Sequence, residues 1–368
     1  MSDLIVETVK IHKIENLPDS DNLQVAYVKG WKVIINKSTG YKVGDTVVYF
    51  PVDSILPYTW ADKFGITKYL KNLPKSRSNY NTAGRIAAAK LRGFCSYGFI
   101  TLPDREWEIG QNLKDYYNVE KYDPDPVFQS EESARPNSLF HKYTDIQNIK
   151  NFPGVFSDGE LVSVTEKLHG ANLRLGYVLE GSEKVFMVGS HNERKRTPAE
   201  CKESNDKGFY WMPLVDSRYK GAIENLLTSN LFKDNISIIL WGELVGKQDL
   251  KYGITNGNME FYAFDISLDG KYLGYEEFRA LCDTYKIPRV SELYVGPYYV
   301  GLIEEFTEGN TKLKDIAQIR EGIVIKSLKE QDSNSGKNRL SKYNNGRKIL
   351  KSISDGYTFR RGNKTENH

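Results

Sequence analysis

The chain has 368 residues, of which 39% are hydrophobic and 12% aromatic, and its 51 basic side chains nearly balance 48 acidic ones. This length suits about two domains, each able to bury a core without disulfides or metal ions. The net charge of +3, taken alone, argues against a nucleic-acid partner. No hydrophobic run approaches the roughly 20 residues that span a bilayer, and the first residues lack a signal-peptide pattern, so we expect a cytoplasmic protein without membrane association.

The cysteines and histidines are too few and too scattered for a zinc site or a disulfide framework. Cys95, Cys201 and Cys282 lie far apart, and none belongs to a CxxC pair. Only five histidines are present. We therefore expect neither structural zinc nor disulfides.

Positive charge is concentrated near the end of the chain. Between Lys337 and Lys364, nine basic residues accompany a single acidic one, Asp355. The rest of the chain is consequently acidic on balance. Such a stretch is either a solvated surface or a surface that binds phosphate groups.

The first hundred residues predict short antiparallel strands separated by turns. β-branched and aromatic residues dominate residues 23–28, 31–35 and 46–50. Closely spaced strands of this kind predict a small β-barrel. Its aromatic residues Trp31 and Tyr49 either fill the core or stack on nucleic-acid bases, and we favour the core. The polar residues 71–81 predict a mobile loop.

A proline-rich segment predicts the domain boundary. Prolines alternate with aspartates over residues 123–126, and the polar residues 129–137 offer few hydrophobic anchors. Regular secondary structure does not accommodate such a segment. We expect an N-terminal domain over residues 1–122, a linker over 123–137 and a second domain over 138–368.

The second domain predicts a mixture of strands and helices. Hydrophobic strands are expected at residues 161–167, 236–241, 260–266 and 322–326, and helices at residues 275–285 and around 219–229. We find no internal repeat. This pattern indicates an α+β fold built on antiparallel sheets.

Lys167 is the most unusual charged residue of this domain. It ends the strand predicted at residues 161–167, and Gly170 follows it in a turn. A charge there is unfavourable unless a pocket needs the amine, or unless the side chain reaches water from an edge strand. As a nucleophile the amine must lose its proton, and at the reference pKa of about 10.4 only about one molecule in 10³ to 10⁴ is neutral at pH 7. Burial or neighbouring cations must then lower that pKa.

Three further segments place acidic or aromatic residues at strand ends. Glu243 lies between two glycines, where its carboxylate is placed to accept hydrogen bonds from a ribose or to hold a metal-bound water. Glu321 precedes a glycine at the start of another hydrophobic strand. Phe264 either packs in the core or stacks on a base. Strict alternation over residues 260–266 puts Phe264 on one face with Tyr262 and Ile266, and puts three residues on the other face: Phe261, Ala263 and Asp265.

Taken in order, these segments resemble the motifs of the covalent nucleotidyltransferases, which include polynucleotide ligases and RNA capping enzymes. The order is Lys-x-His-Gly, Gly-Glu-x-x-Gly, Phe-x-Ala-Phe-Asp-Ile, Glu-Gly-Ile-Val-Ile-Lys and a lysine-rich strand. Residues 166–172, Glu-Lys-Leu-His-Gly-Ala-Asn, resemble the signature of the double-strand-type RNA ligases. DNA ligases and capping enzymes usually have Asp in place of His169.

The resemblance implies that Lys167 attacks the α-phosphate of ATP, releases pyrophosphate and holds AMP as a lysyl phosphoramidate. AMP would then pass to an RNA 5′-phosphate, and an RNA 3′-hydroxyl would displace it and close the strand. Mg²⁺ or Mn²⁺ would be held by Glu321. The resemblance also places around the nucleotide Glu166, Gly170, Asn172, Glu243 on the ribose side, Phe264 on adenine, Lys326, and Lys351 on the α-phosphate.

Two positions depart from the family pattern. The arginine expected between the first and third motifs has three candidates, His191, Arg194 and Arg196, of which Arg196 fits best. The last motif often has two lysines one residue apart, but here only Lys351 stands in that frame and Lys348 precedes it by three residues. Lys348 is therefore the candidate for the second phosphate contact.

The N-terminal domain carries a second resemblance. Residues 41–57 and 85–93 are similar to the OB-type module that precedes the catalytic domain in a small group of RNA ligases. This likeness implies sealing of nicked duplexes at an RNA 3′-hydroxyl. Lys90 and Arg92 are either phosphate contacts or solvated surface.

We therefore expect an ATP-dependent RNA ligase, acting as a monomer, with an N-terminal OB-like barrel and an antiparallel-sheet adenylyltransferase domain. The alternatives are a DNA ligase or a GTP-using capping enzyme, which His169 and the position of the barrel ahead of the catalytic domain disfavour. A non-catalytic RNA-binding protein with this fold would not need Lys167, Glu243 and Glu321 together.

Overall fold

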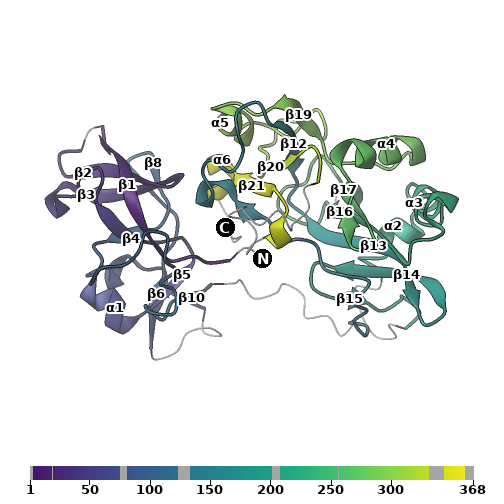
Figure 1. The fold of residues 1–368 in the computed structure, drawn as a ribbon, viewed down its shortest axis with the longest axis horizontal. Helices are drawn as coiled ribbons and strands as arrows, with labels where there is room; N and C mark the ends of the chain where they lie inside the picture. Colours follow the sequence, from purple (N-terminus) through teal and green to yellow (C-terminus); the bar gives the residue numbers. More distant parts are fainter. Residues whose placement is uncertain are drawn as a thin grey trace. The chain divides into compact units, whose positions relative to one another are not determined.

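The chain folds into two compact units (Figure 1). The computed structural model describes residues 3–18, 20–74, 81–122, 133–200, 208–255, 257–330 and 344–360. Unit 1 comprises residues 1–125, 146–155 and 355–368, and unit 2 comprises residues 126–145 and 156–354.

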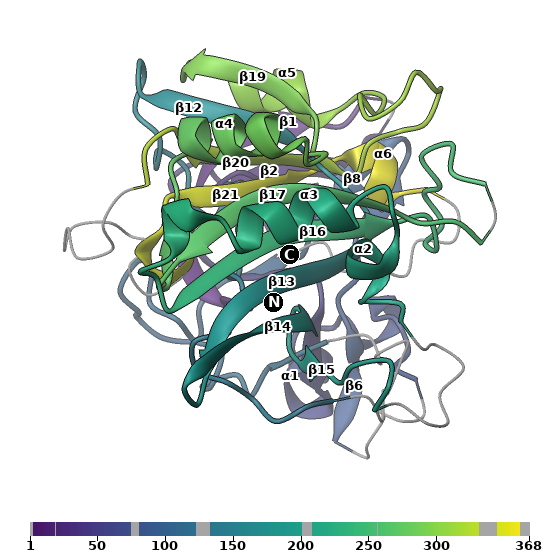
Figure 2. The same ribbon diagram turned by 90° about the vertical axis from the view of Figure 1, so that its right-hand side faces the viewer.

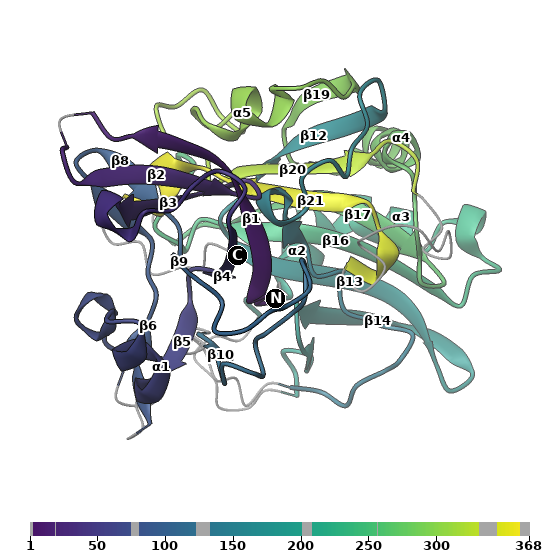
Figure 3. The same cartoon turned by 60° about the vertical axis from the view of Figure 1, so that its left-hand side comes forward.

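Unit 1 is built around a five-stranded antiparallel sheet that curls into a nearly closed barrel (Figure 3). The strand order is β3-β2-β1-β4-β9, with β1 at Glu7–Asn16, β2 at Leu23–Val28, β3 at Trp31–Asn36, β4 at Thr46–Phe50 and β9 at Phe99–Thr101. The N–H of Tyr97 closes the barrel toward β3 by donating to the Lys32 carbonyl at 2.8 Å. The predicted small barrel is confirmed.

The barrel core follows from the alternation of its strands. In β3 the buried residues Trp31, Val33 and Ile35 alternate with more exposed ones, because successive side chains of a strand point to opposite faces. Trp31 and Tyr49 belong to this core and expose only 5% and 2% of their surfaces. The core position that we favoured for both is confirmed.

Smaller elements complete unit 1. They are β5 Ser54–Pro57, β6 Thr82–Arg85 and β10 Glu120–Lys121 in one sheet, the hairpin of β7 Ala89–Leu91 and β8 Phe94–Ser96, the helices α1 Tyr58–Lys63 and α6 Asp355–Thr358, and β11 Gln147–Asn148. The loop predicted at residues 71–81 lies partly outside the described residues, since 75–80 are not described.

Two later segments of the chain belong to unit 1 and not to unit 2, a division that differs from the continuous domains expected above. The Trp31 indole N–H donates to Asn151 Oδ1 at 2.7 Å, and the Phe359 ring packs against Tyr97 with 5.7 Å between centroids. A domain boundary predicted from amino-acid composition cannot take account of such side-chain contacts. Residues 123–132 of the predicted linker lie outside the described part of the chain.

The larger sheet of unit 2 has six antiparallel strands in the order β15-β14-β13-β16-β17-β18. Their bounds are β13 Ala171–Glu180, β14 Glu183–Ser190, β15 Arg194–Lys195, β16 Ser237–Val245, β17 Glu260–Leu268 and β18 Lys271–Tyr272. The helices α3 Lys220–Leu227 and α4 Tyr275–Tyr285 cover one face, and the short helix α2 Met212–Val215 packs beside them (Figure 2). These helices leave the opposite face of the larger sheet uncovered, and the candidate site described below includes residues on that face.

A second antiparallel sheet of unit 2 has the order β21-β20-β12-β19. Its strands are β12 Leu161–Lys167, β19 Glu292–Pro297, β20 Gly322–Ser327 and β21 Ile349–Ile353, with α5 Leu302–Thr307 against β20 and β21. The predicted α+β fold on antiparallel sheets is confirmed, and the helix expected at residues 275–285 coincides with α4. None of the helices within the described ranges is long and apolar enough to cross a membrane.

A bulge in β17 breaks the alternation expected from the sequence. Asp265 pairs with Trp241 but Ala263 pairs with the residue after Trp241, so Phe264 is the extra residue. Ile266 consequently packs with Ala263 in the helix-covered core, and Asp265 shares the face of Phe264. The expected grouping of Asp265 with Ala263 and of Ile266 with Phe264 is wrong, because a bulge shifts the period by one residue.

Candidate active site

Lys167 ends β12 inside a sheet, with β20 on one side and β19 on the other. Its Nζ lies 2.6 Å from Glu321 Oε1, and 27% of its side chain is exposed. An edge-strand lysine that simply extends into water is therefore the wrong interpretation. The amine is held at the end of a central strand by a buried carboxylate.

Glu321 is positioned by the glycine that follows it. Gly322 pairs with Lys167 across the sheet, and a Cβ on Gly322 would lie 2.0 Å from the Ser352 carbonyl oxygen. Only glycine allows this approach, and its φ of +157° also disfavours a side chain. Glu321 Oε2 is buried without a hydrogen bond, and His169 Nδ1 lies 3.8 Å from it. One carboxylate oxygen of Glu321 thus contacts Lys167, and the other forms no hydrogen bond.

The turn after Lys167 brings the first motif onto β16. A Cβ on Gly170 would lie 2.3 Å from the Leu244 carbonyl oxygen, so this turn requires glycine. The His169 N–H donates to Tyr252 Oη at 2.7 Å, and His169 Nε2 lies 2.6 Å from Asp249 Oδ1. These contacts fix the imidazole beside Glu321.

Asn172, Glu243 and Tyr262 form a row across β13, β16 and β17, since each pairs directly with the next. Burial, together with the charge of Glu321, raises the pKa of Glu243 to about 8, although Lys167 opposes the shift. Asn172 Oδ1 is buried without a hydrogen bond. The row supplies polar groups on the face that the helices leave uncovered.

Glu166 points to the opposite face of β12, as expected for the neighbour of Lys167. Its Oε2 accepts the Lys312 N–H at 2.8 Å, and its Oε1 is buried without a partner. Burial raises the pKa of Glu166 above its usual value. The carboxylate of Glu166 therefore lies on the other side of β12 from Lys167.

Phe264 and Lys326 lie in different surroundings. Phe264 is half-buried, with its ring centroid 4.9 Å from that of Tyr143 in an edge-on contact. Lys326 is buried, and its Nζ lies 3.3 Å from Asp265 Oδ1. The other carboxylate oxygen, Asp265 Oδ2, accepts a hydrogen bond from Arg347 Nη2 at 2.8 Å. Burial alone would raise the pKa of Asp265, but Lys326 and Arg347 hold it below its usual value. Lys326 thus serves a buried ion-pair network.

The two lysines of the last strand are not equivalent. Lys351 pairs with Val324 in β20, two residues along from the partner of Lys167, and so faces the side of Lys167. Lys348 is three positions earlier and therefore points to the other face, where its Nζ lies 2.5 Å from Glu160 Oε2. The expected second phosphate contact at Lys348 is not supported, because its amine is engaged by Glu160.

The three candidates for the arginine between the motifs lie beyond β14. His191 Nε2 lies 3.1 Å from Asp145 Oδ1, and Arg194 donates from Nη2 to Glu180 Oε2 at 3.0 Å. Arg196 is exposed, and its guanidinium makes no ion pair or hydrogen bond with the residues described. Its availability is consistent with the choice of Arg196, but the structure does not bring it to Lys167.

Other predicted contacts are also placed. Lys90 and Arg92 are exposed on the β7–β8 hairpin of unit 1, with Arg92 in its turn at φ +48°. Of the basic C-terminal stretch, Lys337, Arg339, Lys342, Arg361 and Lys364 lie outside the described residues. Within the described ranges no group of three His, Cys, Asp or Glu side chains is arranged as a metal site.

Sequence reasoning missed Asp249, Tyr252 and Tyr262. Asp249 and Tyr252 follow the second motif in a loop, and nothing in their local sequence signals that they hold His169. Tyr262 was assigned only to a face of its strand. All three become visible only through contacts between distant segments.

Comparisons with known proteins agree with this geometry. An RNA ligase family model matches residues 160–345, and an OB-fold domain model matches residues 5–103. No curated protein sequence matches the chain.

Similar solved structures are those of a Naegleria gruberi RNA ligase. The one with PPi has a TM-score of 0.71 at 21% identity, over 96% of this chain and 98% of that chain. A variant with ATP and Mn gives 0.73 at 20% identity over 97% and 98%, and one with AMP and Mn gives 0.72 at 21% over 96% and 98%. At this identity the likeness establishes a shared fold. Because the RNA ligase model matches half of the chain and contains Lys167, Glu243 and Glu321, the chain belongs to the RNA ligase family and is an enzyme that joins RNA.

Proposed function

We propose that the protein is an ATP-dependent RNA ligase that carries AMP on Lys167. The observation that carries this proposal is the 2.6 Å contact between Lys167 Nζ and Glu321 Oε1 at the end of a central strand. AMP passes from Lys167 to an RNA 5′-phosphate, and a 3′-hydroxyl then displaces AMP to form the phosphodiester bond.

The residues present fit a nucleotide. Around Lys167, the Asn172 Oδ1 and Glu321 Oε2 atoms are buried without hydrogen bonds, which is costly unless a ligand completes them. Lys351 faces the same side and supplies a positive charge for phosphate. The related Naegleria structures contain ATP, AMP or PPi, which supports ATP as the nucleotide.

The site also fits an oxygen-bound divalent cation. The charge of Glu321 contributes to the raised pKa of Glu243, so a cation between these two carboxyl groups would relieve their repulsion when both are ionised. Mg²⁺ or Mn²⁺ held by Glu321, with Glu243 nearby, would neutralise phosphate charge. Mn is present in the related ATP and AMP structures.

Glu321 and Lys351 have different roles in the first step, the transfer of AMP from ATP to Lys167. Glu321 Oε1 is placed to take a proton from Lys167, which leaves the amine lone pair to form the nitrogen–phosphorus bond. The bond from the α-phosphorus to the bridging oxygen breaks, and pyrophosphate leaves with the electron pair. The nitrogen then gives its second proton to water, which leaves the phosphoramidate. Lys351 stabilises the charge that builds up on the α-phosphate.

The test is incubation of the full chain with α-labelled ATP or GTP and Mg²⁺ or Mn²⁺, followed by denaturing gel and mass spectrometry. We expect label from ATP on Lys167 and none on Lys167→Ala. Absence of covalent nucleotide with every metal and both nucleotides would reject the proposal. Nicked duplexes with an RNA or a DNA 3′-hydroxyl strand then separate an RNA ligase from a DNA ligase, and a GTP label would indicate capping-type chemistry.

A further inference from the structure

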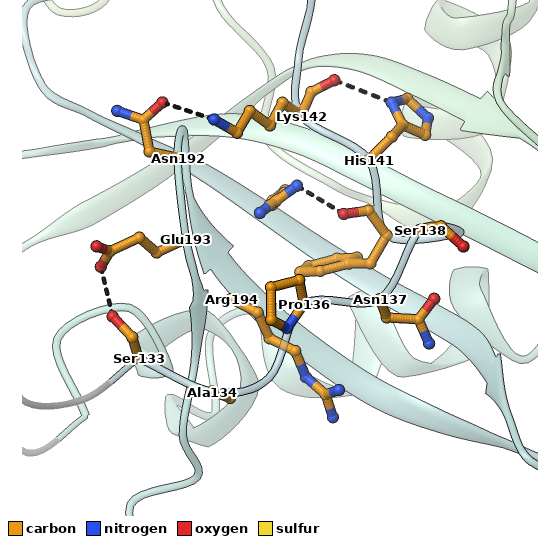
Figure 4. A pocket seen from close by; sticks show the side chains of 12 residues that line it. Ser133, Ala134, Pro136, Asn137, Ser138, His141, Lys142, Asn192, Glu193 and Arg194 are labelled. Atoms are coloured by element: carbon orange, nitrogen blue, oxygen red, sulfur yellow. Dashed lines mark hydrogen bonds between the residues drawn. The ribbon is translucent and has the colours of Figure 1, made fainter.

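Unit 2 contains a cavity of about 570 Å³ beside the uncovered face of the larger sheet (Figure 4). The segment of residues 133–142 forms one wall, and the turn between β14 and β15 forms the other. Figure 4 shows Lys142, Asn192 and Arg194 among the side chains that surround it. None of the residues proposed for AMP transfer lines this cavity.

Arg174 lines the cavity from β13 and is almost fully buried, with 3% of its surface exposed. Its Nη1 donates to the Phe140 carbonyl at 2.7 Å, and its guanidinium carbon lies 4.4 Å from the centre of the Phe140 ring. Nε is buried without a partner, and Nη2 makes no hydrogen bond with any described residue but is not sealed from solvent. Two of its three nitrogens therefore donate no hydrogen bond to a described residue.

No carboxylate among the described residues compensates the charge of Arg174. Burial lowers the pKa of Arg174 to about 10, so the guanidinium remains charged near neutral pH. A buried charge without a counter-charge is strongly unfavourable. A ligand of opposite charge in the cavity would remove that cost.

Among the charged side chains that line the cavity, positive charge exceeds negative charge. Glu193 is engaged by Lys195 at 2.8 Å, and Arg194 is engaged by Glu180. Burial lowers the pKa of His141, which favours its neutral form. Lys142 has no acidic partner among the described residues, and its Nζ lies 3.4 Å from Asn192 Oδ1.

Arg174 lies on the same strand as Asn172, one of the residues proposed to bind the nucleotide. Arg174 follows Asn172 by two residues on β13, so both side chains are on the same face and about 7 Å apart along the strand. A planar guanidinium with free N–H groups matches phosphate oxygens in two-point hydrogen bonding, and a nearby lysine adds a point charge.

We propose that Arg174, assisted by Lys142, binds a phosphate group of the ligase reaction in this cavity. The inference rests on the proposed function for the source of the phosphate. Two groups have this chemistry: the terminal 5′-phosphate of the RNA strand to be joined, and the pyrophosphate end of the nucleotide. Arg174 is a binding residue and takes no part in proton transfer.

The test measures binding by the full chain without divalent metal, so that no ligation occurs. The probes are a labelled nicked RNA duplex with a 5′-phosphate at the nick, the same duplex with a 5′-hydroxyl, and inorganic pyrophosphate. Fluorescence anisotropy reports duplex binding, and calorimetry reports pyrophosphate binding. The variants are Arg174→Gln and Lys142→Gln, with Arg218→Gln as a control in an exposed ion pair with Asp216.

We expect Arg174→Gln and Lys142→Gln to weaken binding of one phosphate-bearing probe about tenfold, the loss expected for a charge-assisted hydrogen bond. Binding of the 5′-hydroxyl duplex and all binding by Arg218→Gln should stay unchanged. Loss confined to the phosphorylated nick assigns the RNA terminus, and loss confined to pyrophosphate assigns the nucleotide.

Equal binding of every probe by wild type and both variants would overturn the inference. Thermal unfolding checks that Arg174→Gln folds, and if it does not, the exposed Lys142→Gln variant decides the result. Lysyl-AMP formation is measured on the same wild-type preparation. Its presence, together with unchanged probe binding, would reject the phosphate cavity while leaving the proposed function in place.

Discussion

Gly170 and Glu243 touch so closely that a Cβ on the glycine would lie 2.7 Å from Glu243 Cγ. The backbone of Gly170 also stabilises the charged form of the Glu243 carboxyl group, which partly offsets the effect of burial on its pKa. The first and second motifs are far apart in the sequence, but they therefore pack against each other in the folded protein. The glycine of the first motif is required by the acid of the second.

Gly170→Ala should lower the free energy of unfolding by about 1–3 kcal/mol, the usual cost of overpacking, and reduce lysyl-AMP formation. The clash with the Leu244 carbonyl involves backbone, so side-chain rotation cannot relieve it. Denaturant unfolding and adenylylation assays measure the two effects. Gly221→Ala is the control, because Gly221 is exposed in α3 with open space around it. That change should stabilise the helix by about 0.5–1 kcal/mol. Equal effects of the two substitutions would contradict the close approach.

Lys351→Ala should reduce the rate of lysyl-AMP formation on the order of 100-fold, because it removes a charge that stabilises the developing phosphate charge. Lys348→Ala should change that rate less than about twofold, since its amine is bound to Glu160 on the other face. Single-turnover labelling with ATP measures both rates. A larger loss in Lys348→Ala than in Lys351→Ala would reverse our assignment of the two lysines.

Glu243 should make the ligand-free protein less stable as the pH rises. Its pKa in the folded protein is about 8 against a reference of 4.5, so between these values the folded state holds a proton that the unfolded chain does not. This contribution to stability is fully present below pH 4.5 and is lost as the pH rises through 8, with a slope of at most about 1.4 kcal/mol per pH unit. Denaturant unfolding between pH 5 and 9 measures the slope. Glu243→Gln should remove this part of it, and identical slopes would show that Glu243 is not perturbed.

Asp265→Ala should destabilise the protein by about 3–5 kcal/mol, because it leaves Lys326 as a buried charge without a carboxylate and removes one of the two carboxylates that bind Arg347. The pKa of Asp265 is lowered in the folded state, so this stability should be present above the unfolded pKa and be lost as the pH falls. Thermal or denaturant unfolding near pH 7 measures the loss. Asp283→Asn breaks an exposed pair with Arg289 and should cost about 1 kcal/mol or less. Similar losses in the two variants would mean that the buried network contributes little.

The local sequence predicted the elements that carry the site because hydrophobic alternation and helical periodicity are local properties. β12 at Leu161–Lys167 and α4 at Tyr275–Tyr285 coincide with the ranges expected for them. Gly242 and Gly322, which adjoin Glu243 and Glu321, lie close to backbone oxygens of neighbouring strands, and the sequence analysis did not predict this approach. The bulge at Phe264 was not predictable, because it depends on how β16 and β17 pair.

The net charge of the chain is nearly neutral, which first argued against a nucleic-acid partner. The positions of the individual charged side chains remove that argument. Of the basic C-terminal residues that the structure describes, Arg347 is bound to Asp265 and Lys348 to Glu160. Lys351 faces the side of Lys167. We interpreted the concentration of charge as either a solvated surface or a phosphate-binding surface, but Arg347 and Lys348 form ion pairs within unit 2.

The sequence by itself determined the order of the motifs, the lysine that we propose as the nucleophile and the family that they indicate, because residue type and spacing carry that chemistry. Only the tertiary structure decided where the charged side chains lie and which of them form ion pairs. It separated Lys351 from Lys348, committed Lys326 to Asp265, and left Arg174 without a counter-charge. The physical reason is that an ion pair requires contact within about 4 Å, and strand register and burial set those distances between residues far apart in the chain.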